Sequence, residues 1–87
     1  MLLPMAHYLV EIENLPSGRY AGRVISAHRS LPLAVAACRV LADRTRRMGL
    51  MARAVTIIGS PLEFIPGELI PAEDVTTAYA ADGTQLR

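Results

Sequence analysis

The chain has 87 residues, 52% of them hydrophobic, and a net charge of +1 at neutral pH, so we expect one small domain over residues 1–87. Its longest apolar run is far shorter than the roughly 20 residues that cross a bilayer, and the basic start of a signal peptide is missing. The single cysteine, Cys38, excludes an intrachain disulfide and is typical of a reducing compartment, so a soluble, cytoplasmic protein with no membrane partner is expected.

The first two predicted elements are β-strands that form an antiparallel hairpin. Residues 7–13 and 19–27 each alternate their side chains between two faces, as strands do. The five residues between these two runs include Pro16 and Gly18, which favour a turn. The alternation places side chains on two opposite faces: Tyr8, Val10, Tyr20 and Val24 on one, and Leu9, Arg19, Arg23, Ile25 and Ala27 on the other.

A helix is expected over residues 31–48. Ser30 suits its N-cap, and Pro32 is tolerated in the first turn because no intrahelical donor is lost there. Apolar residues recur at spacings of three and four, which predicts a buried stripe made of Leu33, Ala36, Ala37, Val40, Leu41 and Met48. We expect this stripe to cover the Tyr20/Val24 face of the sheet and to leave the face with the two arginines open.

A third strand and a proline-rich tail complete the predicted fold. Residues 52–58 are rich in β-branched side chains, which favours a strand. From Pro61 onward prolines recur every five residues, which excludes a helix and disfavours an interior strand. The tail, residues 61–87, is expected to supply short edge strands near 63–70 and 75–80 or to contact a partner chain. The predicted fold is α+β: a small two-layer β-β-α-β domain, mainly an antiparallel sheet of three to five strands, with one helix on one face.

Common catalytic, metal and nucleotide motifs are absent from the sequence. His7 and His28 are far apart along the chain and are interpreted as surface or hydrogen-bonded side chains, because metal sites usually need three or more protein ligands. Cys38 lies in the middle of the predicted helix, which favours a core position over a nucleophile. No glycine-rich phosphate loop occurs. We therefore expect a protein that is not an enzyme, with no catalytic residue, no metal and no cofactor.

Arginine is the one residue type that is concentrated in one part of the sequence and is also suited to bind a charged partner. All nine basic residues are arginines, and residues 15–55 hold eight of them for a local net charge of +7. Arginine binds phosphates bidentately, so Arg19, Arg23 and Arg53 are the predicted nucleic-acid-binding residues. The alternative interpretation is a solvated charged surface with internal ion pairs, such as Arg23 opposite Glu11 across the hairpin.

Two functional hypotheses follow from these patterns. The first is a small non-enzymatic module that binds nucleic acid, specifically DNA, through its arginine-bearing sheet face. The alternative is a homodimeric protein–protein interaction module with no nucleic-acid role. This alternative rests on an apolar content larger than one thin core can hide, and on Leu9, Ile25 and Ala27 lying on the open face.

Overall fold

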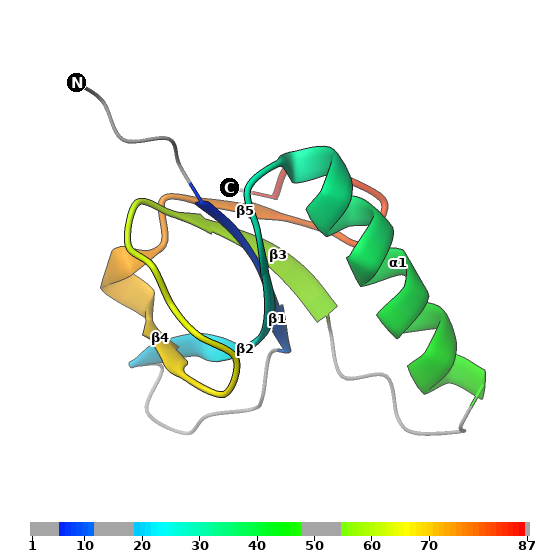
Figure 1. The fold of residues 1–87 in the computed structure, drawn as a ribbon, viewed down its shortest axis with the longest axis horizontal. Helices are drawn as coiled ribbons and strands as arrows, with labels where there is room; N and C mark the ends of the chain where they lie inside the picture. The colour runs from blue at the N-terminus through cyan, green and yellow to red at the C-terminus, as the bar shows by residue number, and fades with distance from the viewer. Residues whose placement is uncertain (1–5, 12–18, 48–54, 87) are drawn as a thin grey trace.

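The computed structural model describes residues 6–11, 19–47 and 55–86, which form one sheet and one long helix (Figure 1). The elements are β1 (Ala6–Glu11), β2 (Tyr20–His28), α1 (Leu31–Arg47), β3 (Val55–Ser60), β4 (Leu69–Pro71), a short 3₁₀ helix (Ala72–Asp74) and β5 (Thr77–Tyr79). The strand order is β4-β2-β1-β3-β5, and every neighbouring pair is antiparallel. The predicted α+β fold, with one helix on one face of an antiparallel sheet, is confirmed.

β1 is the central strand and pairs with β2 on one side and β3 on the other. Both partners run antiparallel to β1, so β2 and β3 are parallel to each other and α1 is the crossover between them. The predicted hairpin register is also confirmed, since Glu11 lies opposite Arg23. The predicted turn at residues 14–18 lies outside the described residues.

α1 begins where the sequence places its cap. The Ser30 hydroxyl accepts a hydrogen bond from the Leu33 amide at 3.3 Å, which satisfies one of the donors left over at a helix start. The helix extends to Arg47, and Met48 lies outside the described residues. Over the described residues, no helix combines the length and the apolar character needed to cross a membrane.

The helix packs on the sheet through a different stripe from the predicted one. Ala34 and Cys38 are fully buried, and Leu31, Val35 and Leu41 pack beside them. Leu33, Ala36 and Val40 were expected in the core and are exposed instead. Among the described residues of the predicted stripe, only Ala37 and Leu41 contact this core cluster. The two small side chains at the centre let the helix axis approach the strands closely, which larger side chains there would prevent.

The helix also covers the opposite face of the sheet from the predicted one. Leu9, Ile25 and Ile57 lie beneath α1, so the face expected to be open is under the helix. The grouping of Tyr8, Val10 and Val24 on one face is correct, but that face holds a second core cluster. Which face a crossover helix covers depends on the hand of the β2-α1-β3 connection, and the alternation of side chains does not contain that information.

The proline-rich tail covers the second face. Phe64 and Val75 pack on the cluster of Tyr8, Val10, Val24, Ile58 and Ile70, and the rings of Tyr8 and Phe64 meet edge to face at 5.4 Å. The tail also provides both outer strands, because β4 pairs with β2 and β5 pairs with β3. Beyond β5, the segment around Gln85 forms a bridge to Tyr79. The tail is therefore part of the domain itself, with sheet strands on both edges.

A β-bulge in β2 changes which side chains share a face. Opposite β1, the pairing moves from Leu9–Ser26 to Val10–Val24, so Ile25 is an extra residue in β2. Both Ile25 and Ser26 are thereby directed to the helix side of the sheet. Ala27, which strict alternation groups with Ile25, instead lies beside Tyr8 on the other face. The sequence-based face assignment is wrong for Ala27 for this reason.

Candidate functional site

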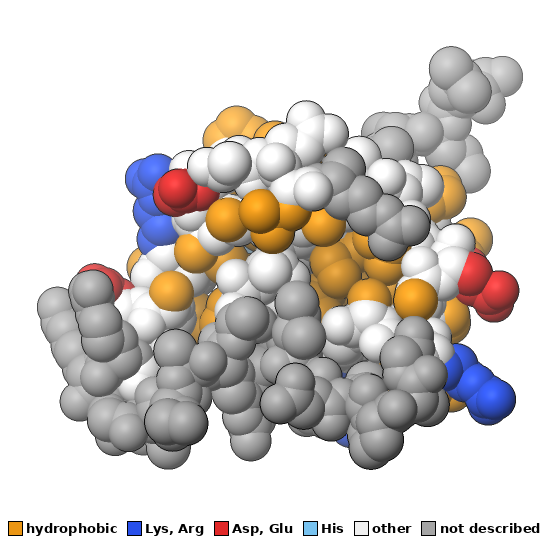
Figure 2. Space-filling view, turned by 180° about the vertical axis from the view of Figure 1, so that it is seen from behind, with side chains coloured by type: hydrophobic (Ala, Val, Ile, Leu, Met, Phe, Trp, Pro, Cys, Tyr) orange, Lys and Arg blue, Asp and Glu red, His pale blue; other side chains and the backbone are white. Residues whose placement is uncertain are grey.

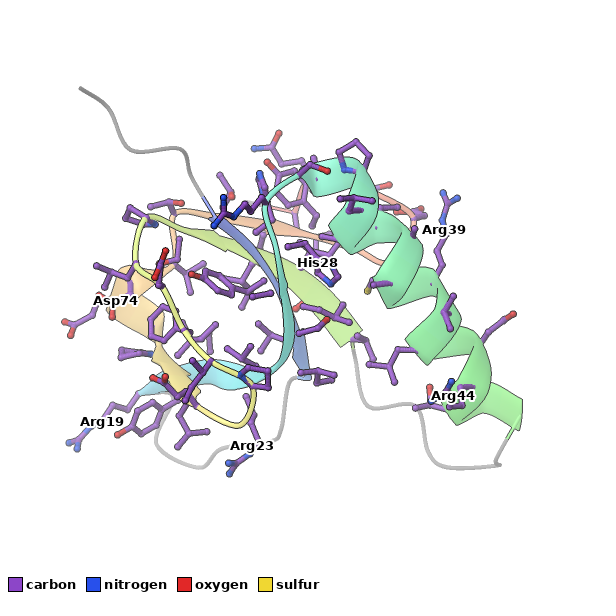
Figure 3. The ribbon with its side chains drawn as sticks, in the orientation of Figure 1. Arg19, Arg23, His28, Arg39, Arg44 and Asp74 are labelled. Atoms are coloured by element: carbon purple, nitrogen blue, oxygen red, sulfur yellow. The ribbon has the colours of Figure 1, made fainter. Side chains whose placement is uncertain are left out.

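The two described arginines of the predicted nucleic-acid site lie at the same end of β2. Both Arg19 and Arg23 have exposed side chains. Figure 3 shows these side chains leaving the lower edge of the sheet in different directions. Arg53, the third predicted residue, lies outside the described residues. The structure therefore places two of the three on one edge of the sheet, beside β4.

The Arg23 side chain is exposed, and it also bonds the backbone of the tail. Its guanidinium donates a 2.8 Å hydrogen bond to the carbonyl of Gly67. Gly67 has φ of 96°, the left-handed region that favours glycine, and its amide bonds the Val24 carbonyl at 2.8 Å. The Val24 amide in turn bonds the Glu68 carbonyl at 2.9 Å. Arg23 thus helps to hold the turn before β4 against β2.

Arg19 lies in a shallow depression of about 470 Å³ at the start of β2. The depression is lined by Tyr20, Pro71, Ala72 and Glu73 as well as Arg19. The Arg19 carbonyl accepts a 2.9 Å hydrogen bond from the Ala72 amide, which joins this end of β2 to the 3₁₀ helix. The carboxylate of Glu73 lies in the same depression and weakens the attraction of Arg19 for a phosphate.

The remaining described arginine side chains do not extend this pair into one basic surface. Arg39 and Arg44 lie on α1, on the other side of the molecule from Arg19 (Figure 3). Arg39 donates a 3.2 Å hydrogen bond to the carbonyl of Asp82 and so ties the turn after β5 to the helix. Figure 2 shows arginines near opposite margins of the rear face, with hydrophobic side chains across its middle.

Ser26 and His28 form a hydrogen-bonded pair that the sequence analysis missed. The Ser26 hydroxyl lies 2.8 Å from Nε2 of His28, and the two residues are neighbours on one face of β2. A serine–histidine contact is the first element of a nucleophilic site, but such a site also needs a group that orients the histidine. Among the described residues no side chain bonds the second ring nitrogen of His28, so the pair lacks that group.

A polar row crosses the helix-facing side of the sheet at the level of His28. His28 lies opposite His7, His7 opposite Gly59, and Gly59 opposite Thr77. Nδ1 of His7 and the hydroxyl of Thr77 are both buried without a hydrogen-bond partner, one on each side of Gly59. The ring of His7 meets that of Tyr79 edge to face at 6.5 Å.

This row offers few ligands for a metal. Within the described ranges, no three His, Cys, Asp or Glu side chains are grouped closely enough to hold a metal ion. Cys38 is fully buried, with its thiol directed at the Val55 carbonyl at 3.5 Å. Burial raises the pKa of the Cys38 thiol, which disfavours the nucleophilic thiolate. Cys38 is thus a core residue, as its position in the sequence indicates.

The outer side of α1 carries an exposed apolar stripe. We call Leu33, Ala36 and Val40 the outer stripe. Leu33 is 61% exposed and Val40 is 59% exposed, although the opposite side of the same helix is already packed on the sheet. A surface helix normally presents charged or polar residues to water on this side, whereas a helix that is apolar on both sides is normally covered on both.

A second group of exposed apolar side chains lies on the tail, away from the helix. Leu62 and Ile65 are both exposed, and Ile65 borders an open depression of about 410 Å³ beside Phe64. Arg29 and Glu63 line the same depression. Tyr8 also lines it, and the Tyr8 hydroxyl bonds the tail backbone. This depression therefore combines one apolar wall with charges of both signs.

No protein-family model, curated protein or solved structure matches this chain.

Proposed function

We propose that this domain is a non-enzymatic protein-interaction module and that the outer stripe of α1 is its contact surface. The observation that supports the proposal is the exposure of Leu33 and Val40 on a helix whose other side is already in the core. Burying the exposed part of each side chain against a partner is worth about 1–2 kcal/mol, before the cost of association.

The shape of the outer stripe also suits a helix or sheet as its partner. Its three residues follow one another at spacings of three and four, so they form a ridge along α1 about 10 Å long. Ala36, between the two larger side chains, permits close approach of another backbone. Ridges of this kind pack into the grooves of a second helix.

The test is a double substitution on the helix, Leu33→Glu with Val40→Glu, in the full chain. We expect the variant to keep the melting temperature of the parent to within about 8 °C, because each change at an exposed position usually alters stability by less than about 0.5 kcal/mol. Its protein partners, measured by quantitative cross-linking in cells, should be depleted at least about tenfold, since two carboxylates would have to be desolvated in the contact.

The matched control is Ile65→Glu, which adds the same charge at a side chain that is 67% exposed on the tail. This variant should retain the partners of the parent protein. Equal retention of partners by the helix variant and the tail variant contradicts the proposal. A large loss of stability in the helix variant also contradicts it, because the stripe would then be packed within its own chain.

Nucleic-acid binding is the second candidate function, favoured by the exposure of Arg19 and Arg23 at one edge of the sheet. Arg19→Ala is the informative change, because Arg23 also bonds the Gly67 carbonyl and its loss would disturb the turn. If the edge binds duplex DNA, removing one phosphate contact should lower the dependence of log affinity on log salt by about 0.9. Fluorescence anisotropy over 50–200 mM salt measures this slope, and an unchanged slope contradicts the role of Arg19.

A further inference from the structure

We propose that the depression beside Phe64 binds a small zwitterion with an apolar side chain, of which an apolar α-amino acid is the simplest example. This depression shares no residue with the outer stripe, so the inference goes beyond the proposed function. Its volume of about 410 Å³ lies within the range of about 300–1,000 Å³ that is typical of small-molecule sites. Its lining also has the usual composition of such sites, which combine apolar walls with a few charged groups.

The apolar wall of the depression is held in place by the fold. The Tyr8 hydroxyl bonds the tail backbone at two points, donating to the Leu62 carbonyl and accepting from the Phe64 amide at 3.0 Å. The Ile65 amide donates a 3.1 Å hydrogen bond to the Glu68 carboxylate. A ligand therefore meets Phe64 and Ile65 on a backbone that is already fixed, which lowers the cost of ordering this wall on binding.

Two exposed side chains of opposite charge also line the depression, Arg29 directly after β2 and Glu63 in the tail. Over the residues that the structure describes, neither of them forms an ion pair, so both charges are available to a ligand. Burial raises the pKa of Tyr8, and the carboxylate of Glu63 adds to the rise. The negative charge of Glu63 therefore acts at the apolar wall itself.

The two charges select a ligand that carries both signs. A guanidinium binds a carboxylate bidentately, and a carboxylate accepts hydrogen bonds from an ammonium group. An apolar acid without an amine is repelled by Glu63, and an apolar amine without an acid is repelled by Arg29. A zwitterion balances both charges, and its apolar side chain covers Phe64 and Ile65.

The small size of the ligand and the open depression predict weak binding. For L-phenylalanine, with about 12 non-hydrogen atoms, we expect a dissociation constant of about 1–5 mM. An NMR titration of the isotopically labelled full chain, up to about 50 mM ligand, covers this range. The shifts should be concentrated at the amides of Ala27, Phe64 and Ile65. If neither L-phenylalanine nor L-leucine causes a saturable shift there, the inference is wrong.

Two analogues of L-phenylalanine separate the roles of the two charges. Phenylpropanoate lacks the ammonium group and phenethylamine lacks the carboxylate, so each should bind about fivefold more weakly than the amino acid. Glu63→Gln should bind phenylpropanoate and L-phenylalanine equally, and Arg29→Gln should do the same for phenethylamine and L-phenylalanine, because each variant lacks the charge that discriminates between them. Equal affinity of the parent chain for all three ligands overturns the selection of a zwitterion.

The matched controls for these variants are Arg44→Gln and Glu73→Gln. Each removes the same charge from an exposed side chain that does not line this depression. Both controls should bind L-phenylalanine as the parent chain does. If they lose as much affinity as Arg29→Gln and Glu63→Gln, the net charge of the chain explains the binding and the assigned site is wrong.

The outcomes separate this inference from the proposed function. Leu33→Glu with Val40→Glu should bind L-phenylalanine with the affinity of the parent chain, whereas Ile65→Glu should lose the ligand and keep the cellular partners. Unchanged ligand affinity in Ile65→Glu overturns the inference and leaves the proposed function in place. Loss of the ligand in the helix variant also overturns it, because the binding site would then lie on α1.

Discussion

Replacing Ile70 with alanine is expected to destabilise the domain by about 2–5 kcal/mol, a large part of the stability of a protein this size. Ile70 lies in the three-residue strand β4, and its side chain is 0% exposed against Tyr8, Val10 and Val24. Alanine removes most of the buried side chain and leaves a cavity that the surrounding strands fill only in part. Urea unfolding followed by circular dichroism measures the loss.

The same substitution at Ile65 is the matched control, because both isoleucines belong to the proline-rich tail. Ile65 is exposed, so its replacement should change the unfolding free energy by less than about 0.5 kcal/mol. If the two variants are equally stable, β4 does not contribute to the core and the tail does not pack on its own chain. A large loss only for Ile70→Ala supports a tail that folds as part of this domain.

Replacing Tyr8 with phenylalanine is the second substitution with a large expected effect, a loss of about 1–3 kcal/mol in unfolding free energy. The Tyr8 hydroxyl donates a hydrogen bond to the Leu62 carbonyl and accepts one from the Phe64 amide at 3.0 Å. Phenylalanine keeps the ring contact with Phe64 but leaves both backbone groups without this partner. The control is Tyr20→Phe, since no described residue bonds the Tyr20 hydroxyl.

The Tyr8 contact also predicts a pH dependence. Burial raises the pKa of Tyr8, and the nearby carboxylates of Glu63 and Glu68 act in the same direction, while the hydrogen bond from the Phe64 amide opposes them. The phenol therefore ionises more readily in the unfolded chain than in the folded one. The stability is fully present below the unfolded pKa of about 10 and falls as pH rises through the folded value.

Urea midpoints between pH 8 and pH 11 test this dependence. Cys38 shows an alkaline effect of the same sign, because burial raises its pKa too, starting from an unfolded value of about 8.5. The Tyr8→Phe variant should keep the fall in stability due to Cys38 and lose the additional fall above pH 10. A parent and a variant that decline in parallel over the whole range contradict the assignment to Tyr8.

The types of element could be predicted from the sequence because their signals are local. Alternation identified β1 and β2, and the Ser30 cap with the spacing after it identified the start of α1. The pairing of Glu11 with Arg23 also followed from a short hairpin. Each of these depends on residues close together in the chain, where backbone preferences and side-chain periodicity act directly.

The orientation of α1 could not be predicted because the helix is apolar on more than one side. Two stripes satisfy the spacing of three and four, and the one with the larger side chains, Leu33 and Val40, was predicted to be the core side. The packed helix instead buries Ala34 and Cys38, because small residues allow a closer approach to the strands. The side of α1 that packs on the sheet therefore depends on how side-chain volumes fit between elements distant in the sequence. The periodicity of the helix contains no information about that fit.

The candidate site was predicted only in part for the same reason. The exposure of Arg19 and Arg23 follows from their charge, but their separation follows from long-range contacts. Arg23 bonds Gly67, 44 residues away, and Arg19 shares its depression with Glu73. The outer stripe was not foreseen as a surface, because it was interpreted as core.

The strand order affects when this domain can fold during its synthesis. β1 and β2 lie near the start of the described chain, yet the sheet is completed on one side by β4 and on the other by β5. β4 pairs with β2 across a long stretch of chain, as between Tyr20 and Pro71, and such distant contacts form slowly because a long loop must close first. A ribosome must therefore translate through Tyr79 before the sheet is complete, and the face of β1 and β2 that the tail covers stays exposed until the tail is made. Chaperones that bind exposed apolar strands should meet this chain during that interval.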